Sequence, residues 1–349
     1  MKAVVTGSGG LIGSECVRLL CEQGWTVVGV DNDMRREFFG EQGTTRPVVD
    51  ELRSTLPSYR HVILDIRNRE GVRDLFREER PEFIIHTAAQ PSHDKAASIP
   101  YEDFDVNAVG TMNVLVAARD FCRESPLCFT STNKVYGDAP NLLPLVELEK
   151  RYDFADGREG IDESMSIDQC LHSLFGASKV AADVMAQEFG RYFQMPVGVF
   201  RGGCLTGPQH SAVELHGYLA YIVLCAIMGR EYTVYGYKTK QVRDQIHCRD
   251  VANLFLAFYR KPRCGEVYNL GGGRQNSLSI LETIDLLSDM GFALRHTYNP
   301  TNRVGDHICY ISDLSKIRSH FPEWHLEYDL RKIIGAIAER RLQSMKVMS

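Results

Sequence analysis

A glycine-rich turn near the start of the sequence constrains the fold more than any other feature. A short apolar run, Ala3–Val5, leads into Thr6–Gly13, and a helical pattern follows. Within this turn, Gly7 permits the tight bend, Gly10 lets the backbone approach a pyrophosphate, and Gly13 packs the helix on its strand. A strand, a glycine turn and a helix in this order predict a dinucleotide-binding site, with the phosphates at the helix N-terminus.

An acidic residue after the next strand indicates which dinucleotide binds. The predicted strand Thr26–Val30 ends in Asp31, 18 residues beyond Gly13. An acid at this place accepts hydrogen bonds from the adenosine ribose and repels a 2′-phosphate. Arg35 and Arg36 could hold the phosphate of NADP, but solvated loop charges are the simpler interpretation. We therefore predict NAD as the cofactor.

The rest of the chain alternates between strand and helix patterns. Further strands are predicted at His61–Ile66, Phe83–Ala89, Leu127–Thr132, Val197–Arg201 and Glu266–Leu270, and helices at Asp105–Cys122, Lys179–Tyr192 and Asp250–Tyr259. Repeated strand–helix units predict an α/β fold with a Rossmann-like, doubly wound parallel sheet.

The pattern becomes mixed after residue 206, which predicts a smaller, discontinuous C-terminal substrate domain. We expect residues 1–206 to form the dinucleotide-binding domain, with Asp244–Tyr268 returning to it. The substrate domain would then hold residues 207–243 and 269–349, with two or three helices after Ser279. The irregular segment Pro140–Cys170 is either a substrate-facing loop or a surface excursion.

Composition excludes several classes of protein. The 349 residues carry a net charge of −5, so there is no basic footprint for nucleic acid or a membrane surface. The ten cysteines form no C-x-x-C pair, which favours free thiols in a reducing cytosol, and no metal site is predicted. An apolar strand begins directly after Met1-Lys2 and no apolar run could span a bilayer, so we expect a cytoplasmic protein.

Motifs along almost the whole chain resemble one family. They are Thr6–Gly13, His86–Ala89, Asn107–Thr111, Thr132–Gly137, Gly176–Lys179, Gly207-Pro208, Arg243-Asp244, Tyr268–Gly273 and Arg303–Asp306. In this order they resemble the extended short-chain dehydrogenases/reductases, which include NAD-dependent nucleotide-sugar epimerases, dehydratases and decarboxylases. Ser131–Asp138 looks most like the CDP-paratose (CDP-tyvelose) 2-epimerases. The 4,6-dehydratases carry an Asp-Glu pair where Asn133-Lys134 stand, which argues against elimination of water.

The resemblance implies a reaction and a set of site residues. Hydride would leave a carbinol carbon of a nucleotide-diphosphate sugar, and it would return to the other face of a transient ketone. Thr132 would hydrogen-bond the reacting oxygen, and Lys179 would bind the nicotinamide ribose. The expected cofactor-binding residues are Gly7, Gly9, Gly10, Leu11, Ile12, Gly13, Asp31, Asn32, Asp65, Ile66, Ala88, Ala89, Asn107 and Lys179. The expected substrate-binding residues are Asn133, Lys134, Arg243, Arg303 and Asp306, with both arginines on the diphosphate.

One catalytic position departs from the family. Leu171–Lys179 resembles the Tyr-x-x-x-Lys helix, but Phe175 stands in place of the tyrosine. A phenyl ring cannot carry a proton, and a positioned acid–base group is worth about 10²–10⁴ in rate. Phe175 is therefore native with another group as base, or an inactivating substitution, or the mark of a protein that binds nucleotide sugar without converting it.

Five groups could replace the missing phenol. Cys204 could serve if a nearby lysine lowered its pKa, although a small buried hydrophobe is the simpler interpretation. His93 lies in a loop that approaches the sugar in relatives, and an exposed loop histidine is as plausible. The others are His172, Ser173, which could instead cap the helix, and Tyr136, which is expected behind the nicotinamide.

Three functional hypotheses remain open. The first is an NAD-dependent 2-epimerase of a CDP-sugar, the second a UDP-sugar 4-epimerase, and the third a catalytically silent binding protein. Relatives dimerise through helices that flank the sheet, including the one that begins near Lys179, so a homodimer is expected.

Overall fold

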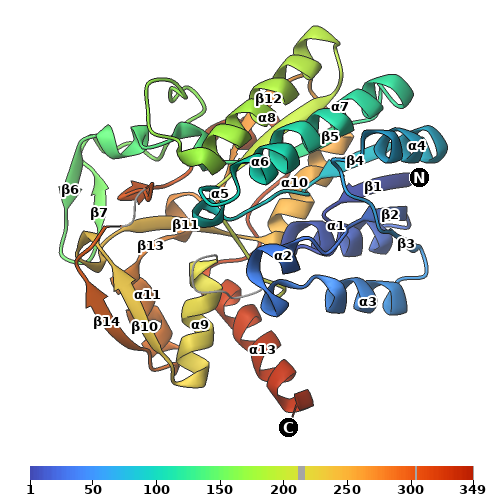
Figure 1. The fold of residues 1–349 in the computed structure, drawn as a ribbon. Coiled ribbons are helices and arrows are strands. Elements are labelled where there is room, and N and C mark those ends of the chain that lie inside the picture. Colours follow the sequence, from blue (N-terminus) through green and yellow to red (C-terminus); the bar gives the residue numbers. More distant parts are fainter. Residues whose placement is uncertain (211–216, 303–304, 349) are drawn as a thin grey trace.

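A seven-stranded parallel sheet forms the centre of the molecule. The computed structural model describes residues 1–210, 217–302 and 305–348, with no side-chain description for 346–348. From one edge to the other, the strands are β12 (Glu266–Leu270), β8 (Val197–Gly202), β5 (Leu127–Thr132), β4 (Phe83–His86), β1 (Lys2–Thr6), β2 (Thr26–Val30) and β3 (Tyr59–Val62). The chain runs outward from β1 to β3 and then crosses back to β4, so the strand order reverses between β1 and β4 (Figure 1). Such a reversal opens a crevice at the carboxyl ends of the strands.

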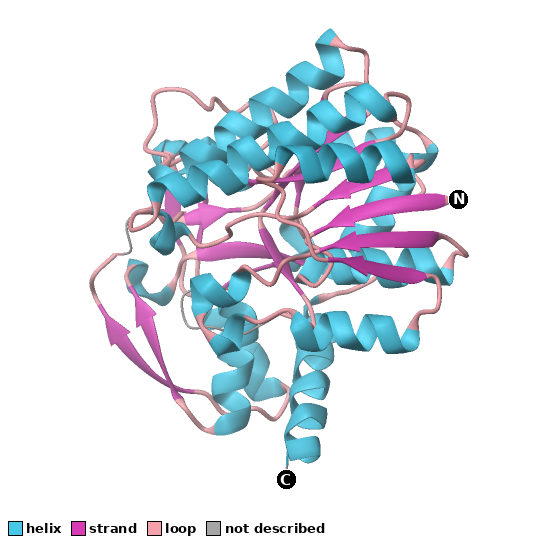
Figure 2. Ribbon diagram, turned by 45° about the vertical axis from the view of Figure 1, so that its right-hand side comes forward, coloured by secondary structure: helices cyan, strands magenta, loops and turns pink. Residues whose placement is uncertain are grey.

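Helices cover both faces of this sheet (Figure 2). One face packs against α1 (Leu11–Glu22), α3 (Arg46–Thr55) and α10 (Cys248–Arg260). The other face packs against α4 (Arg69–Glu79), α7 (Gly110–Phe121) and α8 (Ser173–Tyr192). Successive residues of β1 alternate between the two cores, which explains why the strand is apolar throughout. The predicted doubly wound α/β fold is confirmed.

A second group of elements follows in the C-terminal half. Its four-stranded sheet consists of β9 (Cys204–Thr206), β11 (Val242–His247), β13 (Ser277–Ser279) and β15 (Cys309–Tyr310). A parallel pair, β10 (Glu231–Tyr235) and β14 (Arg295–Asn299), accompanies α9 (Tyr218–Met228), α11 (Ile280–Asp289) and α13 (Leu330–Met348) around a separate hydrophobic core. The remaining helices are α2 (Arg35–Phe39), α5 (His93–Ala96), α6 (Pro100–Phe104) and α12 (Ser315–His320). β11 is a strand of the smaller sheet, whereas β12 is a strand of the large sheet and α10 packs against it. The domain limits stay a prediction.

The predicted third strand, His61–Ile66, is correct at His61 and Val62 and wrong from Ile63 to Ile66. β3 ends at Val62, and Ile63 is 80% exposed. The Asp65 carboxylate accepts hydrogen bonds from the backbone N–H and the guanidinium of Arg67, at 2.8 and 2.7 Å. An Asp that bonds two residues ahead forms a turn, and this local bond competes with the sheet ladder.

The irregular segment Pro140–Cys170 packs against the second group of elements. It contains the hairpin β6 (Leu145–Glu147) and β7 (Tyr152–Phe154). Salt bridges join it to α11, from Lys150 to Asp285 at 2.7 Å and from Arg151 to Glu282 at 3.4 Å.

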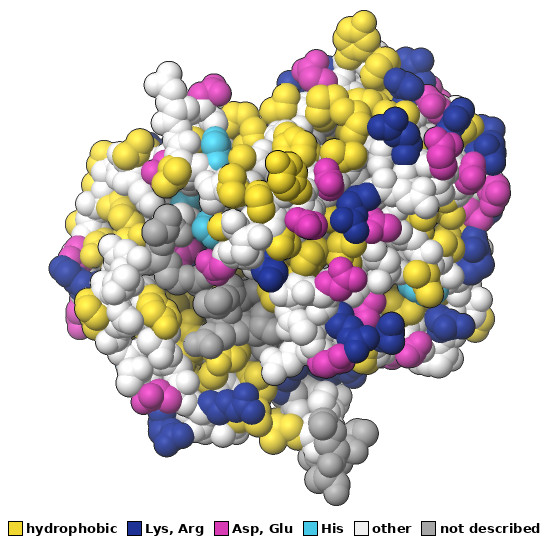
Figure 3. Space-filling view, viewed as in Figure 1, with side chains coloured by type: hydrophobic (Ala, Val, Ile, Leu, Met, Phe, Trp, Pro, Cys, Tyr) yellow, Lys and Arg dark blue, Asp and Glu magenta, His cyan; other side chains and the backbone are white. Residues whose placement is uncertain are grey.

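Hydrophobic side chains gather on the surface over α6 and α8 (Figure 3). The exposed residues there include Tyr101, Phe104, Leu174 and Val184. The expected homodimer through α8 stays a prediction. Among the helices that the structure describes, none has both the length and the apolar composition required to cross a bilayer.

Candidate active site

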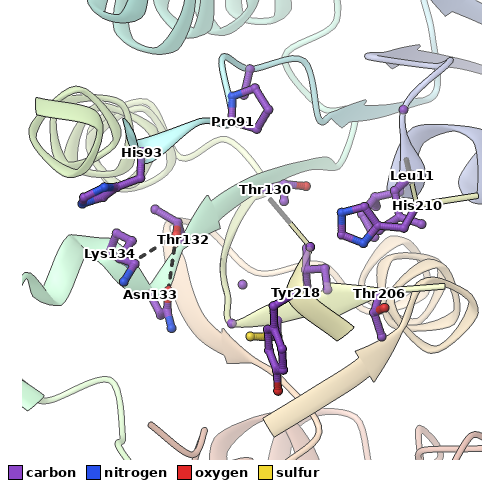
Figure 4. A pocket seen from close by; sticks show the side chains of 18 of the residues that line it. Leu11, Pro91, His93, Thr130, Thr132, Asn133, Lys134, Thr206, His210 and Tyr218 are labelled. Atoms are coloured by element: carbon purple, nitrogen blue, oxygen red, sulfur yellow. Dashed lines mark hydrogen bonds between the residues drawn. The ribbon is translucent and has the colours of Figure 1, made fainter. Parts of the chain in front are cut away.

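A cavity of about 490 Å³ lies at the carboxyl ends of the central strands. Its wall begins at the glycine turn after β1 and passes the ends of β4 and β5 to α8. It continues along β8, β9, α9 and β11, so both groups of elements contribute to it (Figure 4). The volume lies within the range of about 300–1,000 Å³ that small-molecule and cofactor sites occupy.

The glycine turn forms a cradle that side chains would fill. Gly7 has a φ of +70°, and a Cβ atom there would lie 2.8 Å from the backbone nitrogen of Ala88. A Cβ at Gly13 would lie 2.1 Å from the carbonyl oxygen of Gly7. No side chain of the described residues caps α1, so its first amide groups remain available to an anion. The turn therefore fits the pyrophosphate of a dinucleotide.

Asp31 is fixed at the edge of this cradle. Its carboxylate accepts hydrogen bonds from the Gly9 backbone nitrogen and from Thr45 Oγ1, both at 2.9 Å. Arg35 also lines the cavity, and burial lowers its pKa to about 10. The interpretation of both arginines as solvated loop charges is therefore wrong for Arg35, whereas Arg36 is exposed and pairs with Glu41.

The expected cofactor residues divide between the wall and its surroundings. Gly7, Gly10, Leu11, Ile12, Asp31, Ala88, Ala89 and Lys179 line the cavity. The residues that do not line it are Gly9, Gly13, Asn32, Asp65, Ile66 and Asn107. Asp65 is engaged by Arg67.

Asn107 lies in a buried polar network behind the wall. It receives a hydrogen bond from the Gln90 backbone nitrogen at 2.9 Å and donates to Ser178 Oγ at 3.1 Å. Ser178 stands next to Lys179 on α8, so Asn107 is placed to position this helix rather than to touch a ligand.

Thr132, Phe175 and Lys179 come together at the end of β5. The Thr132 Oγ1 atom accepts a hydrogen bond from the Lys134 backbone nitrogen at 3.2 Å. Lys179 follows Phe175 by one turn of α8, and both side chains line the cavity. The Lys179 ammonium donates to the Thr130 carbonyl oxygen at 3.0 Å, and burial lowers its pKa to about 8.

The structure argues against two of the proposed replacement bases. Burial raises the pKa of the Cys204 thiol to about 11, which fits the small buried hydrophobe of the simpler interpretation and not a base with a lowered pKa. In Figure 4 the His93 ring points away from Thr132. A Cβ atom at Gly305 would lie only 2.5 Å from its Nε2 atom, so this nitrogen faces the 305 backbone.

The other three candidates do not line the cavity. His172 Nε2 lies 2.8 Å from the Ile167 carbonyl oxygen. Ser173 Oγ accepts a hydrogen bond from the Gly176 backbone nitrogen at 3.2 Å, as expected for a residue at a helix start. The Tyr136 hydroxyl donates to Asn269 Oδ1 at 2.7 Å, and burial raises its pKa to about 12.

The expected substrate residues converge on one carboxylate. Lys134 Nζ and the Arg243 guanidinium lie 3.8 and 3.7 Å from Asp306 Oδ1. Lys134 also donates to the Gly305 carbonyl oxygen at 2.7 Å. Asn133 lines the same region. Arg303 lies outside the described residues.

Several wall residues were missed in the sequence, among them Gln245 and Tyr218. Gln245 follows Arg243 by two residues on β11, and the period-two alternation of a strand would have placed both on one face. Tyr218 comes from α9, and no local signal in the sequence places it opposite β11. Its hydroxyl accepts a hydrogen bond from Gln245 Nε2 at 2.7 Å.

Comparisons with known proteins agree with this geometry. Residues 3–271 match the model of the NAD dependent epimerase/dehydratase family. The chain is 33% identical over 328 residues to the CDP-paratose 2-epimerase of Salmonella typhi, covering 91% of this chain and 92% of that protein. It is 27% identical over 301 residues to dTDP-glucose 4,6-dehydratase 1 of Escherichia coli K12, covering 83% and 78%.

A solved structure shows the same fold over the whole length. The UDP-glucose-4-epimerase of Stenotrophomonas maltophila, solved with bound NAD and formylated UDP-arabinopyranose, superposes with a TM-score of 0.81. It is 25% identical in sequence, and the match covers 99% of each chain. The family match, the glycine cradle and Asp31 confirm NAD as the cofactor. The chain therefore belongs to the NAD dependent epimerase/dehydratase family.

Proposed function

We propose that the protein epimerises a carbinol carbon of a nucleotide-diphosphate sugar, in a reaction like that of the CDP-paratose 2-epimerases. One observation carries the proposal. A single cavity joins the glycine cradle to Thr132 and Lys179, and then to Arg243. The similarity to the CDP-paratose 2-epimerase over nine-tenths of both chains supports the choice of carbon and nucleotide.

The cofactor end supplies the redox chemistry. Gly7, Gly10 and the first turn of α1 would hold the pyrophosphate of NAD, and Asp31 would hold the adenosine ribose. Bound there, NAD takes up a hydride from the sugar and gives it back. Arg243 would bind the diphosphate of the sugar nucleotide, because a planar guanidinium suits paired phosphate oxygens.

The proton of the reacting hydroxyl is assigned to Lys179. Lys179 lines the cavity one turn of α8 after Phe175. Burial lowers its pKa to about 8, so at neutral pH about a tenth of the molecules carry the neutral amine that can accept a proton. Thr132 Oγ1 would hold the reacting oxygen while the proton moves.

Phe175 favours one alternative, a catalytically silent NAD and nucleotide-sugar-binding protein. A UDP-sugar 4-epimerase is the other, because the cavity does not distinguish the two bases. We also propose that residues 1–206 act as the cofactor domain and that the enzyme is a homodimer.

Substrate conversion by three variants tests the proposal. Purified protein would be incubated in D₂O with CDP- and UDP-linked sugars, and the products followed by NMR. We expect wild-type protein to epimerise a CDP-sugar without solvent deuterium at carbon, because the hydride returns from the cofactor. Lys179→Met should lower the rate by about 10²–10⁴. Phe175→Tyr should change it by less than about 10-fold, and Phe104→Tyr, on an exposed phenylalanine, is the matched control.

Two results would contradict the proposal. If Phe175→Tyr alone is active, then Phe175 silences this chain and the binding-protein alternative is correct. If neither wild type nor Phe175→Tyr converts any CDP- or UDP-sugar, then the epimerase function is wrong.

A further inference from the structure

An uncharged polar region lies next to Thr132 in the cavity. In the β5–β8 ladder, Thr132 stands opposite Gly202, and the chain then passes through Gly203 into β9. Cys204 of β9 in turn stands opposite Gln245 of β11. Both glycines line the cavity, so the short stretch of wall between Thr132 and Cys204 in these ladders carries no polar side chain of its own.

Tyr218 closes this region from the side of α9. Its hydroxyl accepts the hydrogen bond from Gln245 Nε2, and Figure 4 shows the ring between Thr132 and Thr206. This is the Tyr218–Gln245 pair. As the acceptor in this bond, the Tyr218 hydroxyl keeps its own proton to donate.

Two buried oxygen atoms in this region have no hydrogen-bond partner among the described residues. They are Gln245 Oε1 and Thr206 Oγ1, on side chains that are 0% and 2% exposed. Leaving a buried acceptor unsatisfied costs about 1–3 kcal/mol, and native proteins rarely do so. Both side chains line the cavity, so a ligand with hydroxyl groups would satisfy them.

The side chains of this region carry no charge. Cys204, Thr206, Tyr218 and Gln245 are all neutral, since burial keeps the pKa of the thiol near 11 and that of the phenol well above its ordinary value. The cations of the described wall whose charge reaches Cys204 are Arg243 and Lys134, and both lie beside the Asp306 carboxylate, at 3.7 and 3.8 Å from its Oδ1 atom. Arg243 is also the residue assigned to the sugar diphosphate. A carboxylate placed here would lose its water without gaining a cation.

We propose that the Tyr218–Gln245 pair is the sugar subsite and that it selects a neutral sugar over a uronic acid by binding its hydroxyl groups. The inference rests on the proposed function, because it takes the ligand to be a nucleotide-diphosphate sugar. Gln245 Oε1 accepts a hydrogen bond from one sugar hydroxyl, and Tyr218 donates to another. The subsite lies next to Thr132, so it also fixes which carbon meets the reacting groups.

Binding to the NAD-loaded enzyme separates the sugar subsite from the nucleotide subsite. Titration calorimetry would compare CDP with CDP-glucose for wild type, Tyr218→Phe and Gln245→Leu. We expect wild type to bind CDP-glucose more tightly than CDP. Each variant should weaken CDP-glucose about 10-fold and change CDP by less than about twofold, since one hydrogen bond to the sugar is lost. Tyr101→Phe and Gln343→Leu, at exposed positions, are the matched controls and should change neither ligand.

Binding of a uronic acid tests whether the subsite selects a neutral sugar. Wild type should bind UDP-glucose at least about 10-fold more tightly than UDP-glucuronic acid, because the acid brings an unpaired carboxylate. Equal or tighter binding of UDP-glucuronic acid would overturn the selection of a neutral sugar.

Three further results would overturn the subsite. In the first, both variants weaken CDP and CDP-glucose equally, which would make the pair a structural or nucleotide contact. In the second, neither variant changes either ligand. In the third, wild type binds CDP-glucose no more tightly than CDP. Failure of the proposed function would give a different result. If the protein converts no sugar but both variants selectively lose CDP-glucose binding, the epimerase function is wrong and the sugar subsite is still supported.

Discussion

The buried charge of Lys179 should lower the free energy of unfolding, and this effect can be measured. The side chain is 3% exposed, and in the described chain its ammonium has no carboxylate within salt-bridge distance. Burial lowers its pKa from 10.5 to about 8 against the opposing attraction of Asp183 and Asp103. At about 1.4 kcal/mol for each pH unit between these values, the charged lysine destabilises the folded protein by about 3 kcal/mol.

The sign of the pH dependence follows from proton binding. Below pH 8 the lysine is protonated in both the folded and the unfolded chain, so the full penalty is present. Between pH 8 and 10.5 the unfolded chain binds more protons, and the free energy of unfolding rises with pH through this window. Above 10.5 the lysine is neutral in both states and the penalty vanishes.

Replacing Lys179 by methionine should therefore stabilise the protein in a pH-dependent way. Relative to wild type, we expect the free energy of unfolding of Lys179→Met to be higher by about 2–3 kcal/mol at pH 7, since the lost hydrogen bond to Thr130 offsets up to about 1 kcal/mol. The advantage should shrink by about 3 kcal/mol between pH 8 and 10.5. Urea unfolding of NAD-free protein at several pH values measures both quantities.

The difference between the two proteins is the quantity to follow, because other titrating groups cancel in it. Lys261→Met, at an exposed position, is the matched control and should give a difference that stays flat with pH. A flat difference for Lys179→Met as well would refute the reasoning. It would mean that Lys179 is not perturbed by burial and is unsuited to carry the proton at neutral pH.

Three further predictions follow from other parts of the structure. Gly13→Ala places a Cβ atom 2.1 Å from the Gly7 carbonyl oxygen, so it should lower the free energy of unfolding by about 1–3 kcal/mol. It should also weaken the binding of NAD, which calorimetry would measure, and an unchanged NAD affinity would contradict this. Arg201→Met leaves the buried carboxylate of Asp183 without its guanidinium partner at 2.8 Å, and urea unfolding should show a loss of about 3–5 kcal/mol; a loss below about 1 kcal/mol would count against it. With a pKa of about 11, Cys204 is a thiolate in about one molecule in a thousand at pH 8. Mass spectrometry after iodoacetamide treatment should therefore find the exposed Cys264 modified long before Cys204. The reverse order would contradict the raised pKa.

The fold could be predicted from the sequence because its determinants are local. β-branched runs predicted the seven parallel strands, and the glycine turn after Val5 marked where the first helix begins. Asp31 was predicted to meet the adenosine ribose because it follows the second strand directly. Some strand ends were wrong: β3 ends at Val62 because the Asp65–Arg67 turn competes with the ladder, and β4 ends at His86 rather than Ala89.

The candidate site could be predicted only in part. Thr132 and Lys179 could be named from the sequence because each belongs to a motif on one strand or helix, and both line one cavity; their catalytic roles stay predictions. Side-chain direction was not predictable. His93 turns to Gly305, and burial raises rather than lowers the pKa of Cys204.

By itself, the sequence determined the parallel sheet, the glycine cradle and the acid that selects NAD, since these depend on residues a few positions apart. Tertiary structure alone decided which side chains line the cavity beside Thr132. Tyr218, at the start of α9, meets Gln245 of β11 although the two residues lie 27 positions apart in the chain. It also decided how Lys179 ionises, because its pKa depends on burial by segments that no local pattern encodes.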